Sequence, residues 1–251
     1  MYNPFSLEGK TILITGASSG IGRRCAVDCA KMGAKVVAIG RNQERLDSVF
    51  EEMGGNNAIY SYDLLNLAGI KELISRIVGE HGKLDGFIHA AGIEATSPVK
   101  LTNSSEYDML YQVNCLSAFE IVKNLCGIKT FNKGGSVVLI SSISGVIARK
   151  GLSAYAASKG ALMSAARVMA LEMASRGIRV NTISPGTILT PMMQKALDAM
   201  SEEDKKKRID GFPLGLGETT DISNACIYLL SDASRWVTGQ NLIIDGGYTI
   251  Q

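Results

Sequence analysis

A tyrosine and a lysine open a segment of helical length with a spacing of four residues. Tyr155 and Lys159 enclose Ala-Ala-Ser, so on a helix both side chains project from one face. Free tyrosine has a pKa of about 10, too high for efficient proton transfer at neutral pH. A lysine ammonium one turn away favours the phenolate and is expected to lower that pKa. The pair predicts a proton donor, but ordinary helices also carry such pairs, so other motifs must support it.

A serine lies where it could act on the same substrate atom. Ser142 directly follows the apolar run Ser136–Ser141, which predicts a strand. The strand ends before the helix that begins at Tyr155. The Ser142 hydroxyl is therefore expected to hydrogen-bond a substrate oxygen beside the proton donor.

A glycine-rich turn links the first predicted strand, Thr11–Thr15, to a helical segment. Its spacing is Gly-x-x-x-Gly-x-Gly rather than the commoner Gly-x-Gly-x-x-Gly. Glycine permits the tight turn and a close approach of backbone to pyrophosphate, while the helix N-terminus offers free N–H groups and partial positive charge. The alternative is a plain tight turn, but the strand-to-helix context favours a dinucleotide. The expected contacts are Gly16, Ser18, Ser19, Gly20, Ile21 and Gly22.

The end of the second predicted strand indicates which dinucleotide is bound. NAD-selective sites usually place a carboxylate here, against the ribose 2′-hydroxyl. Arg41 stands at this point instead and would pair with a 2′-phosphate. Arg23 or Arg24 could assist, and Asp63, after the third strand, is placed to hydrogen-bond the adenine. These residues predict NADP(H).

Seven short, β-branched runs alternate with helical segments and must position these residues. Near-continuous apolar character is typical of parallel strands covered on both faces. The alternation predicts one α/β domain over residues 1–251, a Rossmann-type doubly wound parallel sheet of about seven strands with helices on both faces. Residues 187–217 are expected to form a substrate-covering insertion, or else a long surface connection. The runs are Thr11–Thr15, Lys35–Gly40, Ala58–Tyr62, Leu84–Ala90, Ser136–Ser141, Arg179–Ser184 and Asn241–Asp245.

Composition excludes several other classes of function. A formal net charge of +2 gives no electrostatic footprint for nucleic acid. No apolar run is long enough for a transmembrane helix, and Met1–Lys10 lacks the apolar core of a signal peptide. The five scattered cysteines have no metal-ligand spacing and indicate reduced thiols. We expect a cytoplasmic protein without a metal site.

Taken together, the motifs resemble the classical short-chain dehydrogenase/reductase family from about Gly9 to Tyr248. The resemblance implies that Tyr155 is the general acid/base, that Ser142 polarises the carbonyl, and that Lys159 holds the nicotinamide ribose. It also implies that Asn114 anchors a proton-relay water, and that the protein is a homotetramer. The implied cofactor contacts further include Tyr155 and Lys159 themselves, Leu64, Ala91, Gly92, Pro185, Gly186, Ile188 and Thr190.

The chain departs from the family pattern at two places. His89 stands where the family has the first residue of Asn-Ala-Ala-Gly, and we expect it to be structural rather than catalytic. The segment Pro213–Gly217 lacks the arginine that many bacterial relatives carry in that loop.

Three functions remain open at this stage. The first is an NADP(H)-dependent oxidoreductase resembling bacterial 3-oxoacyl-(acyl-carrier-protein) reductases of fatty acid biosynthesis, with Lys133 and Arg176 flanking the site to dock an acidic carrier protein. The second is a dehydrogenase or reductase of a free small alcohol, sugar or steroid. The third is a non-catalytic dinucleotide-binding sensor or scaffold, which would not need to keep Ser142, Tyr155, Lys159 and Asn114.

Overall fold

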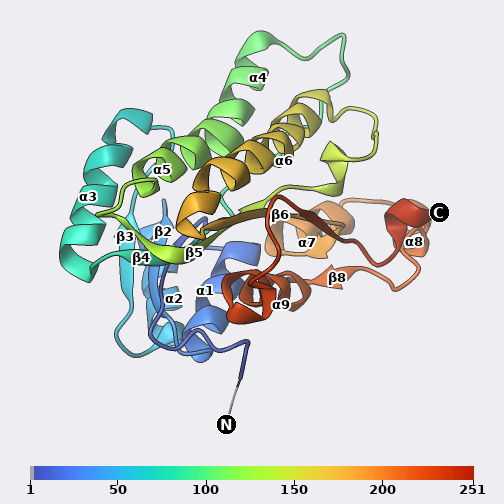
Figure 1. Ribbon diagram of the computed structural model, residues 1–251. Coiled ribbons are helices and arrows are strands. Elements are labelled where there is room, and N and C mark those ends of the chain that lie inside the picture. Colours follow the sequence, from blue (N-terminus) through green and yellow to red (C-terminus); the bar gives the residue numbers. More distant parts are fainter. Residues whose placement is uncertain (1–2) are drawn as a thin grey trace.

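The computed structural model describes residues 3–251. Within these residues, seven strands form one parallel sheet, as the sequence predicts, and their order is β3-β2-β1-β4-β5-β6-β9 (Figure 1). Helices cover both faces, so the central strands are buried almost throughout. The strands are β1 (Thr11–Thr15), β2 (Lys35–Gly40), β3 (Ala58–Ser61), β4 (Leu84–His89), β5 (Phe131–Ile140), β6 (Arg179–Pro185) and β9 (Asn241–Ile244).

The direction of winding reverses next to β1. Ile12 of β1 is in register with Val36 of β2 on one side and with Gly86 of β4 on the other. The chain first winds outward to β3 and then returns across β1 to begin β4. The connections leaving β1 and β4 therefore diverge, which opens a crevice at the carboxyl ends of these strands.

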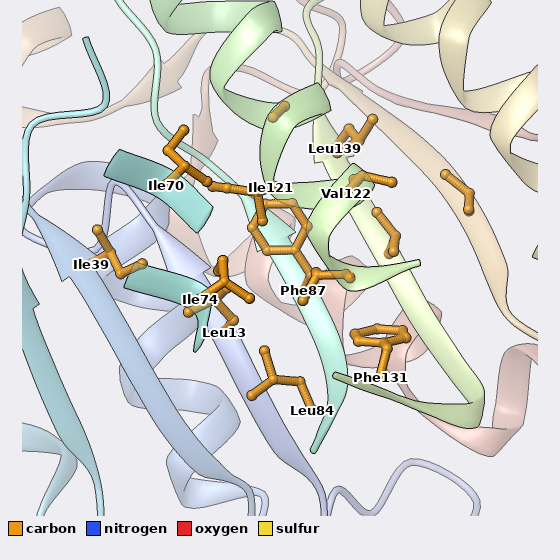
Figure 2. Packing of buried hydrophobic residues seen from close by; sticks show 14 of the residues in the cluster. Leu13, Ile39, Ile70, Ile74, Leu84, Phe87, Ile121, Val122, Phe131 and Leu139 are labelled. Carbon is orange, nitrogen blue, oxygen red and sulfur yellow. The ribbon is translucent and has the colours of Figure 1, made fainter. Parts of the chain in front are cut away.

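Alternate residues of the strands feed two apolar layers. Ile12 and Ile14 pack with α1 (Gly20–Lys31), α2 (Gln43–Met53) and α9 (Thr219–Leu230). Leu13 faces the other layer, whose buried side chains Figure 2 shows around Phe87. That layer is covered by α3 (Ile70–His81), α5 (Ser117–Leu125) and α6 (Ser153–Met173), with α4 (Ser104–Tyr111) against α6. None of the helices within residues 3–251 is long and apolar enough to cross a bilayer.

A π-helical turn, Gln112–Leu116, interrupts the helical run between α4 and α5. Such turns leave backbone groups without their usual helical partners and are frequent at functional sites. Asn114 lies at the centre of this one.

The expected insertion folds into a small lobe at the carboxyl edge of the sheet (Figure 1). It contains β7 (Ile188–Leu189), α7 (Pro191–Asp198), α8 (Glu202–Asp210) and β8 (Gly217–Glu218), with β7 and β8 paired in parallel. The Thr190 and Ser201 hydroxyls accept from Met193 N and Asp204 N at 3.2 and 3.1 Å, which fixes the starts of both helices.

One strand begins well before its predicted start, whereas the other strand ends differ from the prediction by at most one residue. The strand expected at Ser136–Ser141 already begins at Phe131, which pairs with Leu84 before a register irregularity. The polar Asn-Lys-Gly-Gly that follows Phe131 hides this start from a pattern based on apolar runs. The helical run that leads into α3 opens as a 3₁₀ turn, Leu67–Gly69, where the Asn66 side chain accepts from Gly69 N.

Candidate active site

A cavity of about 950 Å³ lies along the carboxyl edge of the sheet, between the ends of the strands and the lobe. It runs from the glycine turn after β1 to the lobe helices α7 and α8. The residues expected to contact cofactor or substrate line this cavity, apart from Arg23 and Arg24. Asn114, the fourth expected catalytic residue, lies behind its wall. The lining members are Gly16, Ser18, Ser19, Gly20, Ile21, Gly22, Arg41, Asp63, Leu64, Ala91, Gly92, Ser142, Tyr155, Lys159, Pro185, Gly186, Ile188 and Thr190.

The glycine turn forms a cradle that side chains would fill. Gly16 has a φ of 69°, and a Cβ there would lie 2.6 Å from the Ala91 nitrogen. Gly20 has a φ of 53°, and a Cβ on Gly22 would clash with the Gly16 carbonyl. The turn ends at the first residues of α1. The free N–H groups and the partial positive charge of this helix N-terminus favour an anion at this end of the cavity. This geometry fits a pyrophosphate.

The adenosine end of the cavity carries Arg41 and a second arginine that the sequence analysis missed. Asn42 caps α2 by accepting from Arg45 N at 2.8 Å, so Arg45 lies in the first turn of the helix, and it lines the cavity with Arg41. The cap motif itself could have indicated this placement. The suggestion that Arg23 or Arg24 assists is wrong: they pair at 2.7 and 2.6 Å with carboxylates of Glu52 and Asp28 and do not line the cavity.

The central part brings the three polar groups together. Tyr155 and Lys159 lie on the first turns of α6, and Lys159 Nζ is 5.8 Å from the centre of the Tyr155 ring. Lys159 also donates to the Ile140 carbonyl at 2.9 Å, which ties α6 to the end of β5. The Ser142 hydroxyl accepts from Ser144 N at 3.1 Å and lines the same wall.

Asn114 braces this wall from behind. Its Oδ1 accepts from Ile93 N at 2.8 Å, and its Nδ2 donates to the Ile93 carbonyl at 3.0 Å and to the Ser158 hydroxyl at 2.9 Å. Ser158 in turn donates to the Tyr155 carbonyl at 2.7 Å. The side chain is completely buried, so these bonds fix the segment after β4 against α6.

Burial decides the electrostatics of the pair. It raises the pKa of Tyr155 above its ordinary value, and the carboxylate of Glu94 adds to the effect while Ser142 acts against it. Burial also lowers the pKa of Lys159 to about 8, although Cys115 and Glu94 act in the opposite direction. The expected lowering of the Tyr155 pKa is therefore wrong for this structure, because desolvation is the largest effect.

His89 lies outside the cavity, at the buried end of β4. Its Nδ1 is 2.9 Å from the Thr15 hydroxyl, and Nε2 has no hydrogen-bond partner among residues 3–251. Burial lowers its pKa to about 3, aided by the positive charge of Lys159, while the backbone near Val113 and Asn114 acts weakly against this. The imidazole is neutral at physiological pH.

Two residues expected beside the site lie elsewhere. Lys133 is exposed near the start of β5, and Arg176 donates to the carbonyls of Cys126 and Phe131. Both therefore lie at the amino end of β5, whereas the cavity lies at the carboxyl ends of the strands. The prediction that Lys133 and Arg176 flank the site is wrong, because position in the sequence does not show at which edge of a sheet a residue emerges.

The substrate end carries charged residues that the sequence analysis did not assign. Glu94 follows β4, Arg149 precedes α6, and Lys207 and Arg208 lie on α8; all of them line the cavity. Lys207 and Arg208 belong to a charge run, Glu202–Arg208, that is typical of a solvated helix, so only the folded lobe shows which of its members face the cavity.

Comparisons with known proteins cover nearly the full chain. A family model described as enoyl-(acyl carrier protein) reductase matches residues 16–249. The chain is 34% identical over 248 residues to 3-oxoacyl-(acyl-carrier-protein) reductase FabG of Thermotoga maritima, covering 97% of this chain and 99% of that protein. It is 32% identical to D-threitol dehydrogenase of Mycolicibacterium smegmatis, with 98% and 95% covered. The crystal structure of a putative short-chain alcohol dehydrogenase from Sinorhizobium meliloti superposes with a TM-score of 0.92 at 29% identity, covering 99% and 100%.

Proposed function

The chain belongs to the classical short-chain dehydrogenase/reductase family, and we propose that it is an NADP(H)-dependent enzyme that interconverts a ketone and a secondary alcohol. The observation that carries the proposal is one continuous cavity, which joins the glycine cradle to Ser142, Tyr155 and Lys159. A dinucleotide lying in the cradle would extend toward these three side chains. A non-catalytic dinucleotide sensor would not need this set of polar groups at the end of its binding site.

The residues of the cradle would hold the nicotinamide dinucleotide, which supplies the hydride when bound. Arg41 and Arg45 face the adenosine end, where a 2′-phosphate would receive two cationic partners. The oxidoreductase class and the nicotinamide dinucleotide follow from family membership. Our choice of the phosphorylated form rests on these two arginines and on the absence of a carboxylate at positions 41 and 42.

In the proposed reaction, Ser142 donates a hydrogen bond to the substrate oxygen and Tyr155 donates the proton that the oxygen gains. Because burial keeps Tyr155 protonated, the side chain is ready to act as an acid in the direction of ketone reduction. The ammonium of Lys159 then stabilises the phenolate that remains. Asn114 acts as a positioning residue, since it holds the wall that carries the reacting groups.

The substrate class has two candidates. A 3-oxoacyl thioester is favoured by the similarity to the Thermotoga maritima reductase. A free small alcohol, sugar or steroid is favoured by the position of Lys133 and Arg176, which leaves the expected carrier-docking residues far from the cavity mouth.

The decisive experiment is a screen of NADPH oxidation against acyl thioesters, diketones, sugars and steroids, with each active compound repeated in the Tyr155→Phe variant. Turnover that depends on Tyr155 supports the proposal. Tight NADPH binding with no turnover of any class would favour the sensor instead.

We further propose a cytoplasmic homotetramer. Apolar side chains near the C-terminus remain uncovered: Ile250 is 87% exposed, and Leu242 and Ile243 are each 38% exposed. Leu171 on α6 is 81% exposed. Symmetric association is the usual way in which such surfaces are covered.

A further inference from the structure

The substrate end of the cavity contains a buried guanidinium nitrogen without a partner. Arg208, near the end of α8, lines the cavity, and its Nε is shielded from solvent with no hydrogen-bond partner within residues 3–251. Burying a polar group of this kind costs free energy, because it loses its hydrogen bonds to water and forms none within the protein. An unsatisfied group of this kind calls for an explanation, and a partner that the chain itself does not supply is one.

A second arginine lies close to the first. Arg149, in the segment between the 3₁₀ turn Ile143–Gly145 and α6, lines the same end of the cavity. Burial lowers the pKa of Arg208, and the positive charge of Arg149 lowers it further. No ion pair found among the described residues includes either guanidinium. Two like charges thus meet at this end without a carboxylate in contact.

The other charged groups facing this end are partly engaged. Lys207 pairs with Glu203 at 2.7 Å, and the Asp204 carboxylate accepts from the Ser201 hydroxyl at 2.7 Å. Glu94 lies near enough to raise the pKa of Arg208, yet it is not within 4.0 Å of it. The lining of this end therefore carries two carboxylates, Glu94 and Asp204, against four cationic side chains, Arg149, Lys195, Lys207 and Arg208. The balance of charge favours an incoming anion.

We propose that Arg208 and Arg149 bind an anionic group, a carboxylate or a phosphate, carried by the substrate itself. The planar guanidinium fork matches both groups geometrically, which an ammonium does not. The inference rests on the proposed function, because it places the anion on the molecule whose carbonyl meets Tyr155. It favours a small keto acid or phosphorylated ketone over a neutral sugar or steroid.

The test uses matched pairs of ketones that differ in charge. These are acetoacetate with methyl acetoacetate, levulinate with methyl levulinate, and dihydroxyacetone phosphate with dihydroxyacetone. Each is titrated by calorimetry into the enzyme saturated with NADP⁺, where ketone and cofactor are both oxidised and no turnover occurs. The readout is therefore binding, independent of whether the ketone is a good substrate. The carboxylate pairs and the phosphate pair identify which anion is preferred.

The expected result is that in at least one pair the anion binds about 10- to 100-fold more tightly than its neutral partner. Arg208→Gln should remove most of this advantage and leave the neutral compound and NADP⁺ within a few-fold of their original affinities. Arg208→Lys should keep only part of it. Lys206→Gln is the matched control, because Lys206 is exposed on the same helix and does not line the cavity.

Two outcomes would overturn the proposal. One is that no anion in the panel binds more tightly than its neutral partner, and the other is that the advantage survives in Arg208→Gln. Weaker NADP⁺ binding in Arg208→Gln with unchanged ketone affinity would assign the arginine to the cofactor instead. The proposed function fails separately, if the kinetic screen finds no turnover that depends on Tyr155.

Discussion

The Nδ1 atom of His89 lies 2.9 Å from the Thr15 hydroxyl, between β4 and β1 and completely buried. The two residues are in register across the strands, where the family pattern has an asparagine in place of the imidazole. Burial lowers the pKa of His89 from 6.5 to about 3. His89 thus still links β4 to β1 through Thr15, but its imidazole resists protonation.

This relationship predicts a sensitivity to acid. Between pH 6.5 and about 3, the unfolded chain binds a proton at His89 that the folded chain does not, so the free energy of unfolding falls as the pH falls. His89→Asn should therefore move the acid unfolding midpoint, followed by circular dichroism, to lower pH. His81→Gln should keep most of the sensitivity, and kcat of His89→Asn should stay within a few-fold. Coincident acid transitions for His89→Asn and the unchanged protein would contradict the prediction.

Tyr155→Phe should abolish most turnover without unfolding the protein. Positioned proton transfer is typically worth about 10²- to 10⁴-fold in rate, and the variant keeps the ring and its packing. NADPH affinity, measured by fluorescence titration, should be unchanged. Tyr107→Phe is the matched control, because Tyr107 is exposed and its hydroxyl donates to Ser153 outside the cavity. Full turnover by Tyr155→Phe would defeat the proposed mechanism.

The pH profile of ketone reduction should report Lys159 rather than Tyr155. Burial raises the pKa of Tyr155, so it stays protonated, while Lys159 loses its proton as the pH rises through about 8. We therefore expect kcat/KM for the ketone to decline above about pH 8. In Lys159→Arg, whose guanidinium stays charged, any remaining activity should not show this decline. If kcat/KM of Lys159→Arg still declined above about pH 8, the decline would belong to a group other than Lys159.

Cofactor preference should follow Arg41. We expect kcat/KM to favour NADPH over NADH, and Arg41→Asp to shift the ratio toward NADH by roughly 10-fold or more, since it replaces a phosphate partner by a like charge. Arg23→Gln should leave the ratio unchanged, because that side chain pairs with Glu52 and does not line the cavity. Equal use of both cofactors by the unchanged enzyme would contradict the assignment.

Light scattering should give a mass of about four times the 26.7 kDa chain. Leu171→Glu places a charge on the most exposed apolar position of α6 and should lower the mass. Leu214→Glu is the control, since Leu214 is 86% exposed but lies in the lobe. A mass near 26.7 kDa for the unchanged protein would show that these apolar surfaces stay uncovered in solution.

Much of the site was predictable because its motifs are local. The glycine turn is required by backbone clashes over a few residues, and the Tyr155–Lys159 pair follows from the period of a helix. The alternation of apolar runs determined the parallel sheet, since strands buried on both faces must be apolar on both. These features depend on spacing along the chain, which the sequence contains directly.

The tertiary structure decided what depends on distant neighbours. Arg176 was expected at the site and lies at the opposite edge of the sheet, whereas Arg208, in a charge run typical of a solvated helix, lines the cavity. The Tyr155 pKa was expected to be lowered and is raised instead. The sequence shows the lysine one turn away, but it does not show how deeply both side chains are buried. Contacts between segments far apart in the chain decide at which edge of the sheet a residue lies, whether its side chain faces the cavity, and how far it is desolvated. Only the folded protein determines these properties.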